Sequence, residues 1–179
     1  MIPGDSFTFA GVNSLEAWGI KVVAYDVFGP QKRDRKQQIP FRHGSYDYGK
    51  KYYNNRTIRL DCMTEIKPLS KSDMREVIYW LHQKSALYLW DEPDKYYIGE
   101  LLESVEVEVL PKYIKQRFVL PMICDPFAYK AHTSRPLTSG INTVDYKGTV
   151  ESPTMIILRN INEVSVSNVV LKAVQHIRA

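Results

Sequence analysis

The sequence has little cysteine and no long apolar run, and both absences narrow the class of protein. Two cysteines in 179 residues are too few for a disulfide-stapled scaffold. Cys62 and Cys124 each lie in an apolar segment, which favours buried free thiols. A single long-range disulfide between them is the alternative. No apolar run approaches the ~18 residues of a bilayer-spanning helix. The N-terminal residues also lack a signal-peptide pattern, so we expect a soluble protein made in a cytoplasm.

Motifs that carry chemistry are missing as well. The four histidines lack metal-ligand spacing to another His or Cys, and no nucleophile elbow, phosphate-binding glycine loop or His-Glu-x-x-His sequence occurs. Asp91, Glu92 and Asp94 form an acidic turn that lacks the ligand spacing and central glycine of calcium-binding loops, so a solvated turn is favoured. We therefore expect no enzyme, no cofactor and no metal centre.

The charge of the chain is only mildly positive. Its formal net charge is +4, and the densest basic stretch is Lys32–Lys36. Such a run is usually a solvated loop, because binding of nucleic acid would require further basic residues and exposed aromatics on the same face. No direct nucleic-acid role is expected.

Aromatic side chains are abundant, with 12 Tyr, 6 Phe and 3 Trp. Tyrosine suits a pleated, half-buried surface, so this composition favours β structure and interfaces. The clearest strand runs from Arg56 to Ile66, where Ile58, Leu60 and Cys62 share one face. Other strands are expected in an opening hairpin (6–9 and 15–25), in a short strand at 39–42 before a turn-rich segment at 43–49, and at 86–90, 96–98, 103–110 and 115–124.

The segment from Ser70 to Leu81 has the pattern of an amphipathic helix. Ser70 or Ser72 can cap it, and Asp73 places acid in its first turn, where the helix dipole favours a negative charge. An apolar stripe follows at helical spacing, with Trp80 at its edge: Met74, Val77, Ile78 and Leu81. This stripe predicts a helix that covers a sheet or an open barrel end.

The best domain boundary lies at residues 134–140, which have the composition of a linker. Beyond it, strands are expected at 143–146 and 154–158, and the apolar run at 164–174 fits either a strand or a helix. About 40 residues is near the lower limit for independent folding. Residues 141–179 are therefore expected to form a partial or reduced second β domain, after a first domain at 1–133.

Four tyrosines crowd one glycine-bounded segment: Tyr46, Tyr48, Tyr52 and Tyr53. Two interpretations stay open. The tyrosines can form a packed hairpin tip with their phenol groups in water, or they can contact a neighbouring subunit, because Tyr is enriched at interface cores.

Five segments, taken together, resemble the N-terminal domain of the distal tail proteins of siphophages. They cover roughly residues 5 to 130: Phe7–Gly11 with Gly19-Ile20, Ile39-Pro40 with His43–Gly49, the strand from Arg56, the helix followed by Ala86–Pro93, and Phe118–Tyr129. The resemblance implies a mainly β, RIFT-related barrel or sandwich with one helix. It also implies that a second, galectin-like β domain starts near Gly148.

The resemblance further implies a structural virion protein of the phage tail tip. Six copies would form a ring hub that joins the tail tube protein to tail-tip proteins and receptor-binding proteins. The candidate subunit interface is Lys32, Arg33, Arg35, Phe41, Tyr46, Tyr48, Tyr52 and Tyr53. The alternative is a carbohydrate- or receptor-binding β module, which would present Trp80, Trp90 or Tyr96 on a concave face.

Overall fold

The computed structural model describes residues 4–27, 29–33, 36–47, 52–65, 67–102, 105, 107–110, 115–146, 148–150, 152, 154–160 and 170. The chain divides into two compact units, Met1–Ser134 and Arg135–Ala179. Within the described residues every helix and strand belongs to the first unit. In chain order they are β1 (Phe7–Phe9), β2 (Val12–Asn13), α1 (Ser14–Trp18), β3 (Ile20–Val27), β4 (Lys36–Gln38), β5 (Ser45–Asp47), β6 (Arg56–Thr64), α2 (Lys71–Leu81), β7 (Ser85–Leu89), β8 (Lys95–Leu101), β9 (Val107–Leu110), β10 (Lys115–Cys124) and β11 (Tyr129–Lys130).

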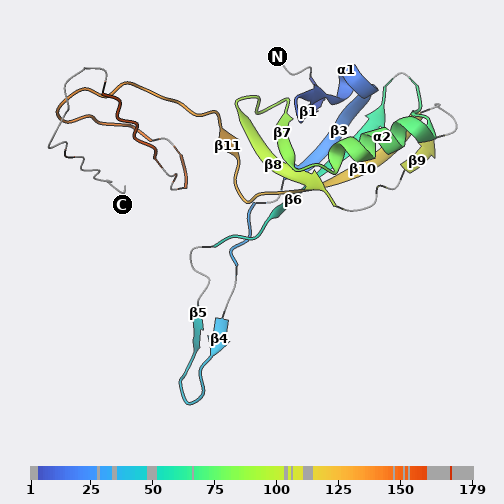
Figure 1. Ribbon diagram of the computed structural model, residues 1–179. Coiled ribbons are helices and arrows are strands. Elements are labelled where there is room, and N and C mark those ends of the chain that lie inside the picture. The colour runs from blue at the N-terminus through green and yellow to red at the C-terminus, as the bar shows by residue number, and fades with distance from the viewer. Residues whose placement is uncertain are drawn as a thin grey trace. The chain divides into compact units, whose positions relative to one another are not determined.

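Nine of these strands form one antiparallel sheet (Figure 1). Its order is β2-β1-β7-β8-β10-β6-β3, with β9 beside β10 and β11 beside β8. Two long strands form its centre, since β10 and β6 pair without a break from Arg117 opposite Met63 to Cys124 opposite Arg56. The prediction of a mostly β protein is confirmed.

The two ends of the sheet meet at a seam formed by Asp5, Phe7, Ser14, Ile20 and Val22. The Val22 N–H donates to the Asp5 carbonyl at 2.8 Å. The buried Ser14 hydroxyl accepts from the Phe7 N–H at 3.2 Å and donates to the Ile20 carbonyl at 3.0 Å. One side chain thus joins β1 to β3 and satisfies two backbone groups that no strand pairs at this point.

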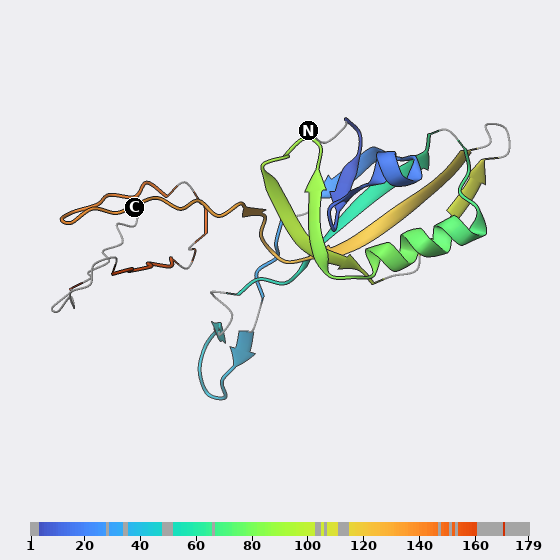
Figure 2. The ribbon, with the colours of Figure 1, turned by 45° about the horizontal axis from the view of Figure 1, so that its top comes forward.

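The core lies between the inner face of the sheet and α2, which runs along the sheet (Figure 2). Alternate residues of β6 and β10 point inward and are fully buried, among them Ile58, Leu60, Leu120 and Met122. Ser70 caps α2 and forms a capping box with Asp73, and Val77 and Leu81 are buried, as the sequence predicts.

Residues 14–18 form a helix, so the strand predicted from Leu15 and the single-helix count were wrong there. The Asn13 side chain accepts from the Leu15 and Glu16 N–H groups, and Gly19 ends the helix at a φ of 65°. β1 therefore pairs with β2 and β7 and not with β3, which pairs with β6 instead. The sequence does not reveal this helix, because Asn13 and Gly19, which cap it, are equally typical of a turn.

Residues 39–42 also differ from the prediction. The strands lie on either side of them, in β4 and β5, and 39–44 form the connecting turn, where the Arg42 N–H donates to the Ile39 carbonyl at 3.2 Å. Pro40 has no N–H to donate, which suits a turn better than a ladder.

In the second unit, the described residues of 135–160 contain no strand, so the strands expected at 143–146 and 154–158 were wrong. A strand needs a partner and a surface on which to bury its apolar face. Ile141, Met155 and Ile157 are instead exposed. Most of the apolar run at 164–174 lies outside the described residues.

Both cysteines are buried free thiols, which settles the alternative left open by the sequence. Cys62 lies opposite Phe118, whereas Cys124 lies opposite Arg56, further along the same strand pair. Burial raises the pKa of both thiols, that of Cys124 to about 12. Neither thiol is therefore a reactive nucleophile near neutral pH.

Replacement of Ser14 by Ala should open the seam. The substitution leaves the Phe7 N–H and the Ile20 carbonyl without a partner, which costs about 1–3 kcal/mol. Urea unfolding measures the loss, and the exposed Ser72→Ala, expected within about 0.5 kcal/mol of wild type, is the control. Equal stabilities of the two variants would contradict a closing role for Ser14.

Gly99 is predicted to tolerate no side chain. A Cβ there would lie 2.5 Å from the Cys124 sulfur and 2.8 Å from the Ile123 carbonyl oxygen. Gly99→Ala should therefore destabilise the protein by about 1–3 kcal/mol, with little rescue by Cys124→Ala because the backbone clash remains. Gly29→Ala, where nothing lies within 4 Å, serves as control in the same thermal melts.

Candidate subunit interface

The β3–β6 pair continues into an arm, defined as residues 29–55 (Figure 1). The pairing of Val27 with Ile58 is followed in the same register by the bridge between Lys32 and Tyr53. Two backbone hydrogen bonds flank this bridge, from the Arg33 N–H to the Tyr52 carbonyl and from the Asn54 N–H to the Gln31 carbonyl, each 2.8 Å. The arm ends in the separate ladder of β4 and β5.

The outer part of the arm buries none of its described side chains. Every residue from 36 to 46 is exposed, including Ile39 and Phe41, and Tyr46 is 51% exposed. An isolated two-stranded hairpin is marginally stable in water, because it has no apolar face to bury. The arm therefore has the properties of a segment that gains stability from a partner surface.

Phe41 stands out at the turn of this hairpin. Its side chain is fully exposed, at 109% of the reference area, and its backbone has a φ of 65°, a region that bulky residues rarely adopt. Such a conformation costs about 1–3 kcal/mol. Phe41 therefore presents a large apolar ring to the solvent at the turn of the hairpin.

The arm also carries the net positive charge of the whole chain. Residues 29–55 contain seven Lys and Arg against two Asp, a net +5, so the other 17 Lys and Arg and 18 Asp and Glu sum to −1. Charges of one sign on the arm disfavour contact between two arms.

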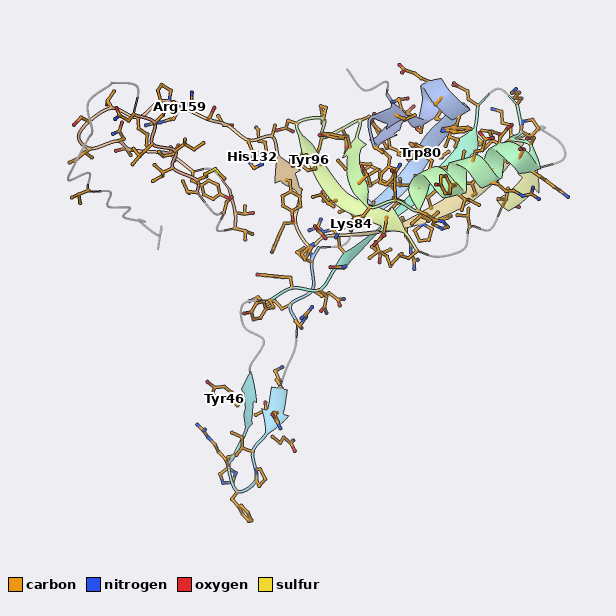
Figure 3. All side chains as sticks on the ribbon, viewed as in Figure 1. Tyr46, Trp80, Lys84, Tyr96, His132 and Arg159 are labelled. Carbon is orange, nitrogen blue, oxygen red and sulfur yellow. The ribbon has the colours of Figure 1, made fainter. Side chains whose placement is uncertain are left out.

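The structure brings the candidate interface residues together on the arm. Lys32, Arg33, Phe41, Tyr46 and Tyr52 are exposed there, and Tyr46 is labelled in Figure 3. Arg35 and Tyr48 lie outside the described residues. The sequence prediction missed the exposed Ile39, although an apolar residue before proline within a polar segment was a usable signal.

Tyr53 differs from the other arm tyrosines. Its ring meets that of Phe127 edge-on, with centroids 5.0 Å apart, and the side chain is half-buried. Tyr52, its neighbour in sequence, is 65% exposed. Tyr53 therefore fixes the root of the arm, and Tyr52 belongs to its open surface.

The three aromatic residues that a carbohydrate-binding module would present, Trp80, Trp90 and Tyr96, pack against other side chains of the protein. Trp80 stacks on Phe7 at 5.8 Å and donates its Nε1–H to the Phe9 carbonyl (Figure 3). Trp90 lies edge-on to Tyr25. Tyr96 lies between two other rings, those of Tyr88 and Tyr129. These contacts explain the three aromatics without a bound sugar.

The acidic turn at residues 91–94 is tied to the sheet by partners of its own. Asp91 accepts a hydrogen bond from the Tyr25 hydroxyl, Glu92 pairs with Lys95 at 2.7 Å, and Asp94 pairs with Lys130 at 3.2 Å. The hydrogen bond from Lys130 holds the pKa of Asp94 below its ordinary value.

Within the described part of the chain, no three His, Cys, Asp or Glu side chains gather closely enough to hold a metal ion. No described helix is long and apolar enough to cross a membrane.

Comparison with known proteins identifies the first unit. The family model described as the phage tail protein RIFT-related domain matches residues 19–124, more than half of the chain. Among solved structures, the fold is similar to that of the Dit protein of phage SPP1, with a TM-score of 0.54, 17% sequence identity, and coverage of 70% of this chain and 52% of that chain. No curated protein matches.

The chain thus spans about half the length of the Dit chain, which its title describes as a paradigm of the hub of the adsorption apparatus in phages that infect Gram-positive bacteria. The mainly β, RIFT-related fold and the resemblance to siphophage distal tail proteins are confirmed.

Tyr25 should make the stability of the protein depend on pH in alkaline solution. Burial, followed by the hydrogen bond to Asp91, raises the pKa of Tyr25 to about 12. Because the folded pKa lies above the unfolded value of about 10, this contribution is complete below pH ~10 and is lost as the pH rises towards 12. Urea midpoints at pH 9 and 11 should fall more steeply for wild type than for Tyr25→Phe. The exposed Tyr52→Phe should keep the wild-type slope.

Proposed function

Because this chain belongs to the phage tail proteins with a RIFT-related domain, we propose that it is a structural virion protein of the tail tip. Six copies form a ring that serves as a hub. The ring joins the tail tube protein to the tail-tip proteins and, through them, to receptor-binding proteins. Its role is assembly and not catalysis, and the protein is made in the cytoplasm of the host bacterium before it enters the virion.

The exposed arm is the observation that carries this proposal. A hairpin with no described buried side chain and a strained, fully exposed Phe41 at its turn needs a partner. A second copy of the same chain offers that partner in every assembly, since a virion hub is built from identical subunits.

Charge determines which kind of contact the arm makes. A two-fold contact of arm against arm would bring two surfaces of net +5 together, whereas the remainder of each chain carries −1. An arm on the body of the next subunit is a heterologous contact, and repetition of such a contact closes into a ring when its rotation divides the circle. The arm is thus compatible with a ring in which each arm lies on the body of the next subunit.

We propose that residues 141–179 form a partial or reduced galectin-like β domain, which residues 134–140 link to the first. Support comes from the large apolar residues exposed in the described part of this unit, among them Ile141 and Met155. Exposed apolar residues of this kind are typical of a surface that packs against other β structure. Receptor binding is not assigned to these residues.

The purified chain should form a particle of about six times 20.7 kDa in mass photometry, and rings in negative stain. The double substitution Phe41→Ser and Tyr46→Ser should return it to monomers, because both side chains lie on the exposed arm. Its free energy of unfolding as a monomer should change by less than about 0.5 kcal/mol.

Tyr79 provides the matched control for this experiment. It is an aromatic residue 83% exposed on α2, away from the arm, and Tyr79→Ser should leave the assembly intact. A wild-type chain that stays monomeric at high concentration, alone and with other tail-tip proteins, would refute the ring. Equal dissociation by both sets of substitutions would refute the role of the arm.

A further inference from the structure

The segment Asp125–Ala128 forms a bulge between two strands that run along the same neighbour. β10 ends with Cys124 opposite Gly99, and β11 begins with Tyr129 opposite Tyr96, both on β8. Four residues therefore lie opposite the two residues Tyr97 and Ile98. β11 is the continuation of β10 beyond the bulge, and the chain passes from it into residues 131–134 and the second unit.

One side of the bulge contacts the root of the arm. The Phe127 ring meets the Tyr53 ring at 5.0 Å with an interplanar angle of 73°. Tyr53 forms the bridge to Lys32, and flanking backbone hydrogen bonds hold this position in the ribbon. A change in the direction of the arm therefore displaces the ring against which Phe127 packs.

The other side of the bulge holds β11 in place. The Asp125 N–H donates to the Ile98 carbonyl at 2.7 Å. Its carboxylate accepts from Lys84 at 3.2 Å and from the Tyr129 hydroxyl at 3.3 Å. Beyond it, the Tyr129 ring lies 5.7 Å from that of Tyr96, and Lys130 pairs with Asp94.

β11 is itself weakly held. It has two residues, its side chains are exposed, and exposed ion pairs such as that of Lys130 contribute little to stability. A strand of this kind opens locally at low cost, so small changes in the bulge alter the fraction of time that it stays paired.

We propose that the bulge couples the arm to β11, so that binding of the arm to a neighbouring subunit changes how firmly β11 is paired with β8. The neighbouring subunit rests on the proposed function, but the coupling is a property of the single chain. In an assembled hub, this device links the closure of the ring to the pairing of β11 with β8.

Hydrogen–deuterium exchange of the full-length chain tests the coupling, with Tyr53→Ala as the variant and Tyr52→Ala as the matched control. Loss of the aromatic pair should speed exchange in residues 125–130 by roughly two- to ten-fold. Tyr52→Ala removes an equal ring from the open surface and should leave this segment unchanged. The conservative Tyr53→Phe should restore wild-type exchange, since it keeps the ring.

Reciprocity supplies the second measurement, because coupling between two sites acts equally in both directions. Phe127→Ala should speed exchange of the Arg33 and Asn54 amides at the arm root by a similar factor. Exchange in β6 and β10 reports whether either variant has lost the fold. If Phe127→Ala has lost it, Phe127→Leu takes its place. Wild-type rates in both segments, or equal effects of Tyr52→Ala and Tyr53→Ala, would overturn the coupling. If the variants exchange as predicted but the wild-type chain never forms a ring, the coupling stands and the proposed function is refuted.

Discussion

The seam between β1 and β3 joins the two ends of the sheet, and the core depends on it. The seam is held by the two hydrogen bonds of the Ser14 hydroxyl and by the bond from the Val22 N–H to the Asp5 carbonyl. Because β1 and β3 meet at the seam, the inner faces of β6 and β10 enclose a core in which Phe7, Phe9, Ile20 and Val22 are buried. α1 places Ser14 at the seam. The helix is capped by Asn13 at its start and by Gly19, in the left-handed region, at its end. An open sheet of the same strands would leave two edges and one apolar face in water, which invites aggregation.

The closed body and the arm have opposite physical properties. The body buries a continuous apolar core, whereas the arm extends the β3–β6 ribbon into a hairpin whose described outer residues are all exposed. The arm is basic and aromatic, whereas the body is nearly neutral. The packing of Tyr53 on Phe127 connects the two, so the part of the molecule suited to assembly begins at a defined contact and not at a loose loop.

Several elements could be predicted from residue patterns alone. The alternation in Arg56–Thr64 and Lys115–Cys124 and the capping box of α2 gave the central strands and the long helix, because these segments bury one face and their period is visible. The exposed arm residues followed from the crowding of Tyr, Arg and Lys between turns. The resemblance to the tail protein family also came from the order of such segments, and the family match confirms it.

Pairings and short elements were decided by tertiary structure. The sequence of 14–18 suits a strand as well as a helix, and burial of the Ser14 hydroxyl at the seam selected the helix. Which strand lies beside β3, and how β11 continues β10 across a bulge, depend on contacts between residues far apart in the chain, and no local pattern contains them. Local periodicity determined that the protein is β-rich with an amphipathic helix. Only the closed fold determined where the chain exposes Phe41 and buries Ser14, since burial is a property of the whole chain.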